Sequence, residues 1–241
     1  MPTAGLLVIG NEILSGKVVD TNSPFLATEL RSLGVDLDRI LTIPDEIDTI
    51  AREVRAMSDA YDFVFTSGGI GPTHDDVTMD AIARAFGREL ELNQSMCERI
   101  ERSQGSPLNE SQQKMALIPS NSQVIDAGDL WFPVVIVENV HIFPGIPKLL
   151  QKKFLSIRDR FRGVPFQLRR IYVKQRESEI AVHLNDLLIE FPDLMLGSYP
   201  RIEEKDYRVL LTLESRDGDY LVRAQEALLS RLESDAIFKV E

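Results

Sequence analysis

The stretch that decides the fold runs from residue 62 to residue 76 and reads Asp62-Phe63-Val64-Phe65-Thr66-Ser67-Gly68-Gly69-Ile70-Gly71-Pro72-Thr73-His74-Asp75-Asp76. Its first five residues are mostly apolar and β-prone, so they predict a buried strand. The glycines that follow allow positive φ angles and close approach of the backbone to a ligand. Helical spacing resumes directly after Asp76, at Val77, Ala81, Ile82 and Ala85. A strand, a glycine loop and a helix in this order put the loop at the carboxyl edge of a parallel sheet, where ligands of α/β proteins bind.

The residues before the glycine loop alternate between strand and helix patterns. Residues 5–10 and residues 35–43 are short β-prone runs, the second closed by Pro44. Between them, Ser23-Pro24 predicts a helix start. The apolar residues at helical spacing in the two intervening segments are Leu26, Leu30, Leu33, Ile47, Ile50, Ala51, Val54 and Met57. This alternation predicts an α/β domain in which helices cover both faces of a parallel sheet, giving three layers.

The pattern changes further along the chain. Residues 94–103 and 110–116 have helical patterns, residues 134–143 predict a β-hairpin around Glu138-Asn139, and a helix is expected to follow through Phe161. Gly163-Val164-Pro165 is typical of a linker. The expected elements after it are strand 166–174, helix 177–191, strands 195–199 and 207–213, helix 219–232 and a short strand around Phe238. This βαββαβ order predicts a small ferredoxin-like α+β unit over residues 166–241, after a first domain over residues 1–163.

Composition excludes several classes of protein. The chain has 241 residues and a formal net charge of −11, which argues against a binder of nucleic-acid backbones. Its one cysteine, Cys97, allows no disulfide within the chain and fits a reducing compartment. No signal peptide is recognisable and no apolar run reaches the roughly 18 residues of a membrane span. We therefore expect a cytoplasmic protein with no nucleic-acid or membrane partner.

The glycine loop has two interpretations. Backbone N–H groups at a glycine loop and a helix start favour a bound phosphate. Thr73-His74-Asp75-Asp76 also resembles a variant of a helix capping box, in which the aspartates only complement the helix dipole. Carboxylates beside a phosphate site need a cation to offset repulsion, and Mg²⁺ commonly bridges carboxylates and phosphates. The acidic pair thus favours a metal-assisted phosphate site, although the residues alone leave the capping interpretation open.

Two other motifs fail on spacing. Residues 10–17 resemble a P-loop, but five residues separate the glycines and Val18 occupies the place of the Ser or Thr that binds Mg²⁺. His74, His141 and His183 are scattered, and no His/Cys pair has zinc spacing. We expect His141, in an apolar strand, to be a structural histidine, and Cys97 to be no nucleophile.

Several motifs together resemble a known family. Residues 68–78 closely resemble the signature of the MoaB/Mog molybdopterin-binding family. Residues 10–16, with Asp20-Thr21-Asn22, resemble the first motif of its CinA-type branch, and Pro44-Asp45-Glu46 and Pro144-Gly145-Ile146-Pro147 follow in the expected order. The downstream segments 197–200 and 207–213 are similar to the region that follows this domain in eukaryotic-type FAD synthases. The likeness to that N-terminal domain covers nearly the whole chain.

The chain departs from the CinA-type pattern in two places. Residues 126–133 stand where that branch has an Asn-x-x-Gly-x-Ala-Pro-Gly segment, and Leu149 stands where it has Glu. The sequence contains neither a nicotinamide-mononucleotide deamidase domain nor an FAD-synthesising domain. Those two activities are therefore not carried over.

The resemblance implies a metal-dependent pyrophosphatase acting on FAD or ADP-ribose, with FAD slightly favoured. Gly68, Gly69, Gly71 and Thr73 would cradle phosphate, with Ser67 and Pro72 completing the loop. Asp45, Asp75 and Asp76 would hold a divalent metal (Mg²⁺, Mn²⁺ or Co²⁺, with K⁺ as a further candidate ion), and Asp45 and Asp76 would be catalytic. Glu12 and Asn22 are weaker ligand candidates. The alternative is a binding module for molybdopterin or a nucleotide without hydrolytic activity, because a fold does not imply a function. By analogy with relatives, we expect a homo-oligomer.

Overall fold

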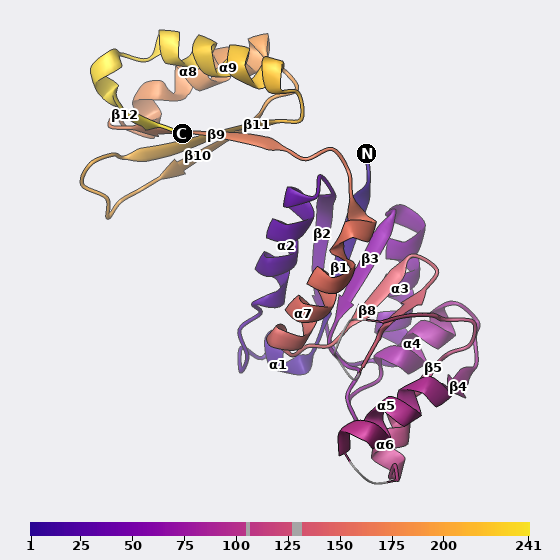
Figure 1. The fold of residues 1–241 in the computed structure, drawn as a ribbon. Helices are drawn as coiled ribbons and strands as arrows, with labels where there is room; N and C mark the ends of the chain where they lie inside the picture. Colours follow the sequence, from indigo (N-terminus) through magenta and orange to yellow (C-terminus); the bar gives the residue numbers. More distant parts are fainter. Residues whose placement is uncertain (105–106, 127–131) are drawn as a thin grey trace. The chain divides into compact units, whose positions relative to one another are not determined.

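A six-stranded sheet forms the centre of the first unit of the computed structural model, Met1–Gly163 (Figure 1). The strands lie in the order β2-β1-β3-β8-β7-β6. β1 (Thr3–Ile9) lies between β2 (Asp36–Ile43) and β3 (Phe63–Ser67), and β3 also pairs with β8 (Val140–Phe143), all in parallel. The structure describes residues 1–104, 107–126 and 132–241. The predicted parallel sheet is confirmed.

The far edge of this sheet is antiparallel. β7 (Val134–Val137) and β8 form the predicted hairpin. β6 (Gln123–Ile125) pairs with β7 and was not predicted. A separate pair, β4 (Leu90–Leu92) with β5 (Leu117–Pro119), was also not predicted.

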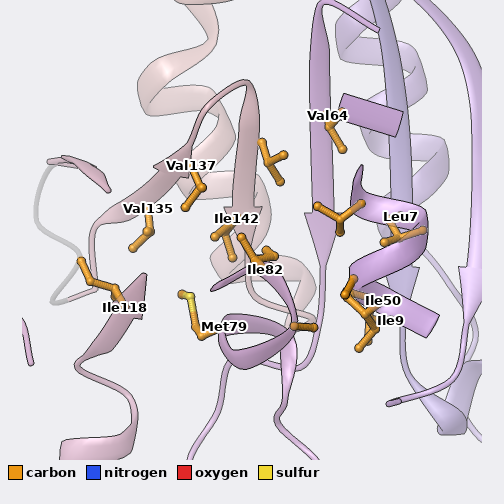
Figure 2. Close-up of a cluster of buried hydrophobic side chains, with 14 of the residues drawn as sticks. Leu7, Ile9, Ile50, Val64, Met79, Ile82, Ile118, Val135, Val137 and Ile142 are labelled. Atoms are coloured by element: carbon orange, nitrogen blue, oxygen red, sulfur yellow. The ribbon is translucent and has the colours of Figure 1, made fainter. Parts of the chain in front are cut away.

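Helices cover both faces of the sheet, which confirms the three-layer expectation. The helices of this unit are α1 (Asn11–Leu14), α2 (Asn22–Ser32), α3 (Ile47–Ala60), α4 (Thr78–Ala85), α5 (Gln94–Gln104), α6 (Glu110–Lys114) and α7 (Pro147–Ile157), the last continued by a 3₁₀ turn, Arg158–Phe161. Alternate side chains of a strand point to opposite faces. Leu7 and Ile9 of β1 accordingly join the core under α3 and α4 (Figure 2), whereas Leu6 and Val8 join the core under α2 and α7.

Two helix starts differ from the expected ones. α2 begins at Asn22 rather than after Ser23, because the Asp20 carboxylate accepts the N–H groups of Asn22 and Ser23 at 2.9 and 3.1 Å. α4 begins at Thr78, so Asp75 and Asp76 lie in a turn before the helix and not in its first turn. The aspartates are therefore not helix caps in this structure.

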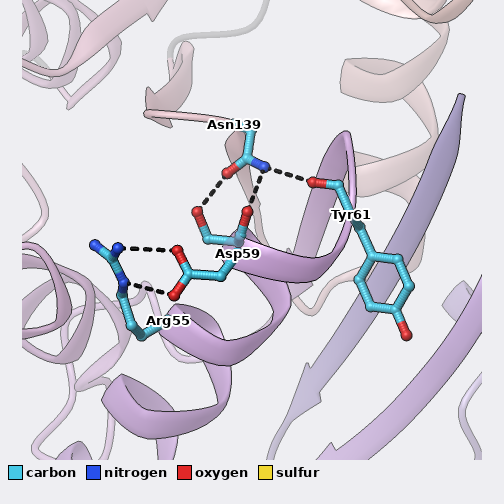
Figure 3. A network of polar contacts seen from close by, with 5 residues as sticks. Arg55, Asp59, Tyr61 and Asn139 are labelled. Atoms are coloured by element: carbon cyan, nitrogen blue, oxygen red, sulfur yellow. Dashed lines mark hydrogen bonds and ion pairs between the residues drawn. The ribbon is translucent and has the colours of Figure 1, made fainter.

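A polar network fixes the end of α3 to the β7–β8 turn (Figure 3). The side-chain amide of Asn139 donates to the carbonyls of Ser58 and Tyr61 at 3.0 and 2.8 Å, and its oxygen accepts the Ser58 hydroxyl at 2.6 Å. The last carbonyls of a helix lack hydrogen-bond donors within the helix, and the Asn139 side chain provides donors for two of them here. Arg55 and Asp59 form an ion pair one turn apart on the same helix.

The second unit, Val164–Glu241, has one antiparallel sheet in the order β10-β11-β9-β12. Its elements are β9 (Gln167–Val173), α8 (Glu177–Glu190), β10 (Met195–Pro200), β11 (Val209–Ser215), α9 (Gly218–Arg231), a 3₁₀ turn (Ser234–Ala236) and β12 (Ile237–Val240). Both helices cover the same face of the sheet (Figure 1) and share its core. The order and pairing are those of a ferredoxin-like unit, as predicted. Across the described residues of both units, no helix combines the length and the apolar character needed to cross a bilayer.

Candidate functional site

The glycine loop lies at the carboxyl end of β3 and is held by hydrogen bonds on two sides. Gly68 donates its N–H to the carbonyl of Phe143 at 3.1 Å. The buried Thr78 hydroxyl donates to the Gly68 carbonyl at 2.9 Å, and the Thr78 N–H donates to the Gly69 carbonyl at 3.0 Å. The loop is thus fastened both to β8 and to the start of α4, which fixes the shape of its backbone.

Two glycines of this loop are required by their surroundings. Gly68 has φ +110°, and a Cβ placed there would lie 2.1 Å from the carbonyl oxygen of Ile9. Gly69 has φ +66°, and its Cβ would lie 2.3 Å from the Thr78 hydroxyl oxygen. Side chains are excluded by both the backbone angle and the space. The loop backbone therefore stays close to β1 and α4 and faces the adjoining pocket.

A pocket of about 540 Å³ opens beside the loop. Six of the predicted site residues line it, namely Glu12, Gly68, Gly69, Gly71, Pro72 and Asp76. The other walls are mostly apolar and come from Val18, Ile70, Met115, Phe132, Pro144, Gly145, Ile146, Pro147, Leu149 and Lys153. A cavity of this size with apolar walls and a few polar groups is typical of a site for a small organic molecule.

Two of the predicted carboxylates, Glu12 and Asp76, line this pocket, whereas Asp45 and Asp75 lie outside its lining. Asp45, which follows β2, accepts the Asn11 N–H at 2.8 Å. Partial burial raises the pKa of Asp45, and the negative charges of Glu12, Asp75 and Asp76 raise it further against the lowering effect of the Asn11 bond. Carboxylates from the loops after β1, β2 and β3 therefore repel one another. The sequence could predict this proximity only through the family motifs.

The turn before α4 is ordered by its own side chains. The Asp76 carboxylate accepts the N–H and the hydroxyl of Thr73 at 2.9 and 2.5 Å. The Thr73 hydroxyl also lowers the pKa of Asp75, with a smaller contribution from His74. Lys114 of α6 donates to the Thr73 carbonyl. Thr73 is thus engaged within the turn and does not line the pocket.

The acidic groups do not form a tight ligand cage. Within the described residues, no group of three or more His, Cys, Asp and Glu side chains is close enough to hold a metal ion. Carboxylate oxygens are nevertheless the ligands that Mg²⁺ prefers. The negative charges of Glu12, Asp75 and Asp76 repel the Asp45 carboxylate, and a bound cation would reduce this repulsion. The donor chemistry fits a divalent cation.

Asn22 and Ser67 face each other away from the pocket. The Asn22 amide donates to the Ser67 hydroxyl at 2.9 Å and to the Gly145 carbonyl at 2.8 Å. Both residues are buried, and neither lines the pocket. Asn22 therefore ties the glycine loop to the Pro144–Pro147 turn, and its own side-chain oxygen has no hydrogen-bond partner among the described residues.

Lys153 is a pocket residue that sequence reasoning missed. Its side chain lies among buried residues of α7 with only 2% of the residue exposed, and its amine donates to the carbonyls of Phe132 and Pro133, the latter at 3.0 Å. Burial lowers the pKa of Lys153 to about 7, and the charge of Arg99 contributes. Leu150, Lys153 and Phe154 fall on one helical face. A lysine within this apolar stripe is the sequence feature that could have indicated a buried amine.

Two residues set aside on sequence grounds are buried as expected. His141 lies in the sheet with its Nδ1 3.1 Å from the Asn139 carbonyl, and burial lowers its pKa to about 4. Cys97 is buried and its thiol has a raised pKa, mainly through burial. The burial of both side chains fits the structural roles expected from the sequence. Residues 127–131 of the segment that departs from the CinA-type pattern lie outside the described residues.

Comparison with known proteins gives the family. Residues 5–161 match the model described as a probable molybdopterin binding domain, and residues 165–241 match the FAD synthase middle domain. A protein of Archaeoglobus fulgidus is 36% identical over 221 residues, which cover 91% of this chain and 93% of that protein. A probable FAD synthase of Caenorhabditis elegans is 33% identical over 98% of this chain, and this chain spans about half of it (51%).

A solved structure agrees. The crystal structure of a CinA protein of unknown function from Thermoplasma acidophilum is similar with a TM-score of 0.62 and 29% identity, over 66% of this chain and 98% of that one. The resemblance drawn from the motifs is thereby confirmed. The second unit matches the model of the FAD synthase middle domain, and the chain belongs to the family of probable molybdopterin-binding domains.

Proposed function

We propose that the protein is a metal-dependent nucleotide pyrophosphatase that cleaves the diphosphate bond of FAD or ADP-ribose. The observation that carries the proposal is the pocket that Glu12 and Asp76 line together with the glycine loop, with Asp45 near enough for the charges of Glu12, Asp75 and Asp76 to raise its pKa. Backbone N–H groups of a glycine loop suit phosphate oxygens, and clustered carboxylates suit the cation that accompanies a diphosphate.

Different residues of the chain would bind the diphosphate, hold the cation and accept a proton. Gly68, Gly69 and Gly71 would bind the diphosphate through the loop backbone, with Ser67, Pro72 and Thr73 maintaining its shape. Asp45, Asp75 and Asp76 would hold the cation, which would supply neutralisation of phosphate charge. Asp45, whose pKa is raised, is a candidate to accept a proton from the attacking water.

The apolar walls suit the organic part of such a substrate. Phe132, Ile146 and Leu149 offer surfaces against which an aromatic ring can lie, and these walls adjoin the glycine loop. The preference for FAD rests on similarity of the chain to FAD synthases, including a middle-domain match that covers the second unit.

The test is the initial rate of AMP release from FAD, ADP-ribose and NAD with Mg²⁺, Mn²⁺ or Co²⁺, each with and without K⁺. We expect Asp76→Asn to lower the rate at least about a hundredfold, because an amide is a poorer metal ligand and carries no charge. Asp38→Asn, an exposed residue of β2, is the matched control and should retain the wild-type rate. A fully active Asp76→Asn variant would refute the assignment of roles.

A second candidate function is a binding module for molybdopterin or a nucleotide without hydrolysis. The specific observation in its favour is that the described carboxylates form no preassembled metal cage, although the loop and pocket are well formed. Binding of a pterin phosphate by a preparation that cleaves none of the three substrates would select this function.

A further inference from the structure

The second unit contains a cavity of its own, of about 520 Å³, between the start of α8 and the loop that joins β10 to β11. Its charged lining residues are Arg176, Glu177, Arg201, Glu204, Lys205 and Arg208. Four cations thus face two carboxylates in a chain whose formal net charge is −11. Excess positive charge at one point of an acidic protein indicates a site for an anion.

The four cationic side chains of this cavity have no carboxylate partners within the described part of the chain. Among the residues that the structure describes, none of the four forms an ion pair with a carboxylate or a side-chain hydrogen bond. By contrast, Arg231 of the same unit pairs with Glu190 at 2.5 Å. Of the two carboxylates in the cavity, Glu177 accepts the Ser198 hydroxyl at 2.5 Å. The donors of the four cations therefore remain available to a ligand.

Backbone hydrogen bonds bring three of the arginines together. Arg201 donates its N–H to the Arg208 carbonyl at 2.7 Å, which closes the base of the β10–β11 loop. Arg208 donates its N–H to the Val173 carbonyl at 2.8 Å, at the end of β9, three residues before Arg176. The Arg176 N–H is taken by the Glu179 carboxylate at 2.7 Å. Side chains, and not this helix start, are therefore the groups left to hold an anion.

We propose that this cavity binds a small molecule carrying two or more phosphate charges. Guanidinium groups form paired hydrogen bonds with phosphate oxygens, and several converging cations favour a multiply charged group over a single carboxylate. The volume matches that of small-molecule sites, which hold about 300–1,000 Å³. A nucleic-acid strand is disfavoured because it would bring many further phosphates against an acidic protein. This site is separate from the glycine-loop pocket and does not depend on its proposed activity.

The test is a titration of the full chain with inorganic pyrophosphate, without divalent metal, followed through backbone amide NMR signals. We expect saturable shifts at residues 176–179 and 201–209, and these report on this cavity separately from the amides of the glycine loop. Arg201→Gln and Arg208→Gln should each weaken this binding about tenfold, since each removes a charge-assisted contact.

Arg170→Gln is the matched control, because Arg170 is an exposed arginine of β9 in the same unit that does not line the cavity. It should leave the dissociation constant within about twofold. The spectra themselves report whether each variant is folded. Absence of shifts at these amides, or equal weakening by Arg170→Gln, would overturn the proposal, since the first shows no site and the second shows general charge attraction only.

Discussion

The Thr78 hydroxyl donates a 2.9 Å hydrogen bond to the Gly68 carbonyl in the fully buried space between the glycine loop and α4. This bond joins the first turn of a helix to a backbone whose φ angle only glycine readily adopts. The loop conformation is thus determined by a side chain ten residues later in the chain.

Replacement of Thr78 by Val tests this bond at nearly constant volume. The Gly68 carbonyl would lose a buried donor, which costs about 1–3 kcal/mol of unfolding free energy. We expect a lower urea midpoint together with weaker binding of any ligand of the loop. Thr78→Ser keeps the hydroxyl and loses a methyl group, so it should retain more ligand affinity than Thr78→Val. If the two variants bind equally, the hydroxyl does not set the loop shape.

Gly68→Ala tests the steric argument, with Gly87→Ala as its control. Both glycines have positive φ angles, but a Cβ at Gly68 would lie 2.1 Å from the Ile9 carbonyl oxygen, whereas a Cβ at Gly87 meets nothing within 4 Å. We expect Gly87→Ala to cost about 1–2 kcal/mol, from backbone angle alone. Gly68→Ala should cost clearly more or prevent folding. Thermal unfolding of both variants measures this difference. Similar melting temperatures would contradict the close packing of the loop against β1.

Burial of Lys153 predicts a dependence of stability on pH. Its pKa is about 7 in the folded protein against an ordinary value of 10.5, so the unfolded chain binds the proton more tightly between these values. The contribution of Lys153 to stability should therefore rise as pH increases from about 7 to 10.5 and should be constant below that window. Lys153→Met should remove this component of the slope in urea unfolding at pH 7, 8.5 and 10. Lys152→Met, at the exposed neighbouring position, is the control and should leave the dependence of stability on pH unchanged. If Lys153→Met also leaves this dependence unchanged, the Lys153 amine is not desolvated.

Much of this architecture could be predicted from sequence periodicity. Strands such as β1 and β3 are apolar runs, and α3 has a clear helical stripe, so local patterns were sufficient. The three-residue strands β4, β5 and β6 were missed because so short a segment has no measurable period.

The candidate site could be predicted less completely, because its contacts are long-range. Asn22 was considered as a ligand from its motif, yet its partners Ser67 and Gly145 lie 45 and 123 residues away, and no local pattern shows that it ties two loops together. The apolar wall formed by Met115 and Phe132 comes from segments with no motif. The glycine loop itself was predictable, since backbone geometry demands particular residues at particular positions.

The central claim is that the glycine-loop pocket cleaves a nucleotide diphosphate bond, and one measurement tests it most directly. The purified chain is incubated with FAD and Mn²⁺, and FMN and AMP are quantified over time, with Asp45→Asn measured alongside the wild type. The account predicts FMN and AMP in equal amounts from the wild-type protein and a loss of at least about a hundredfold in the variant. Absence of both products, or equal rates for the two proteins, would contradict it.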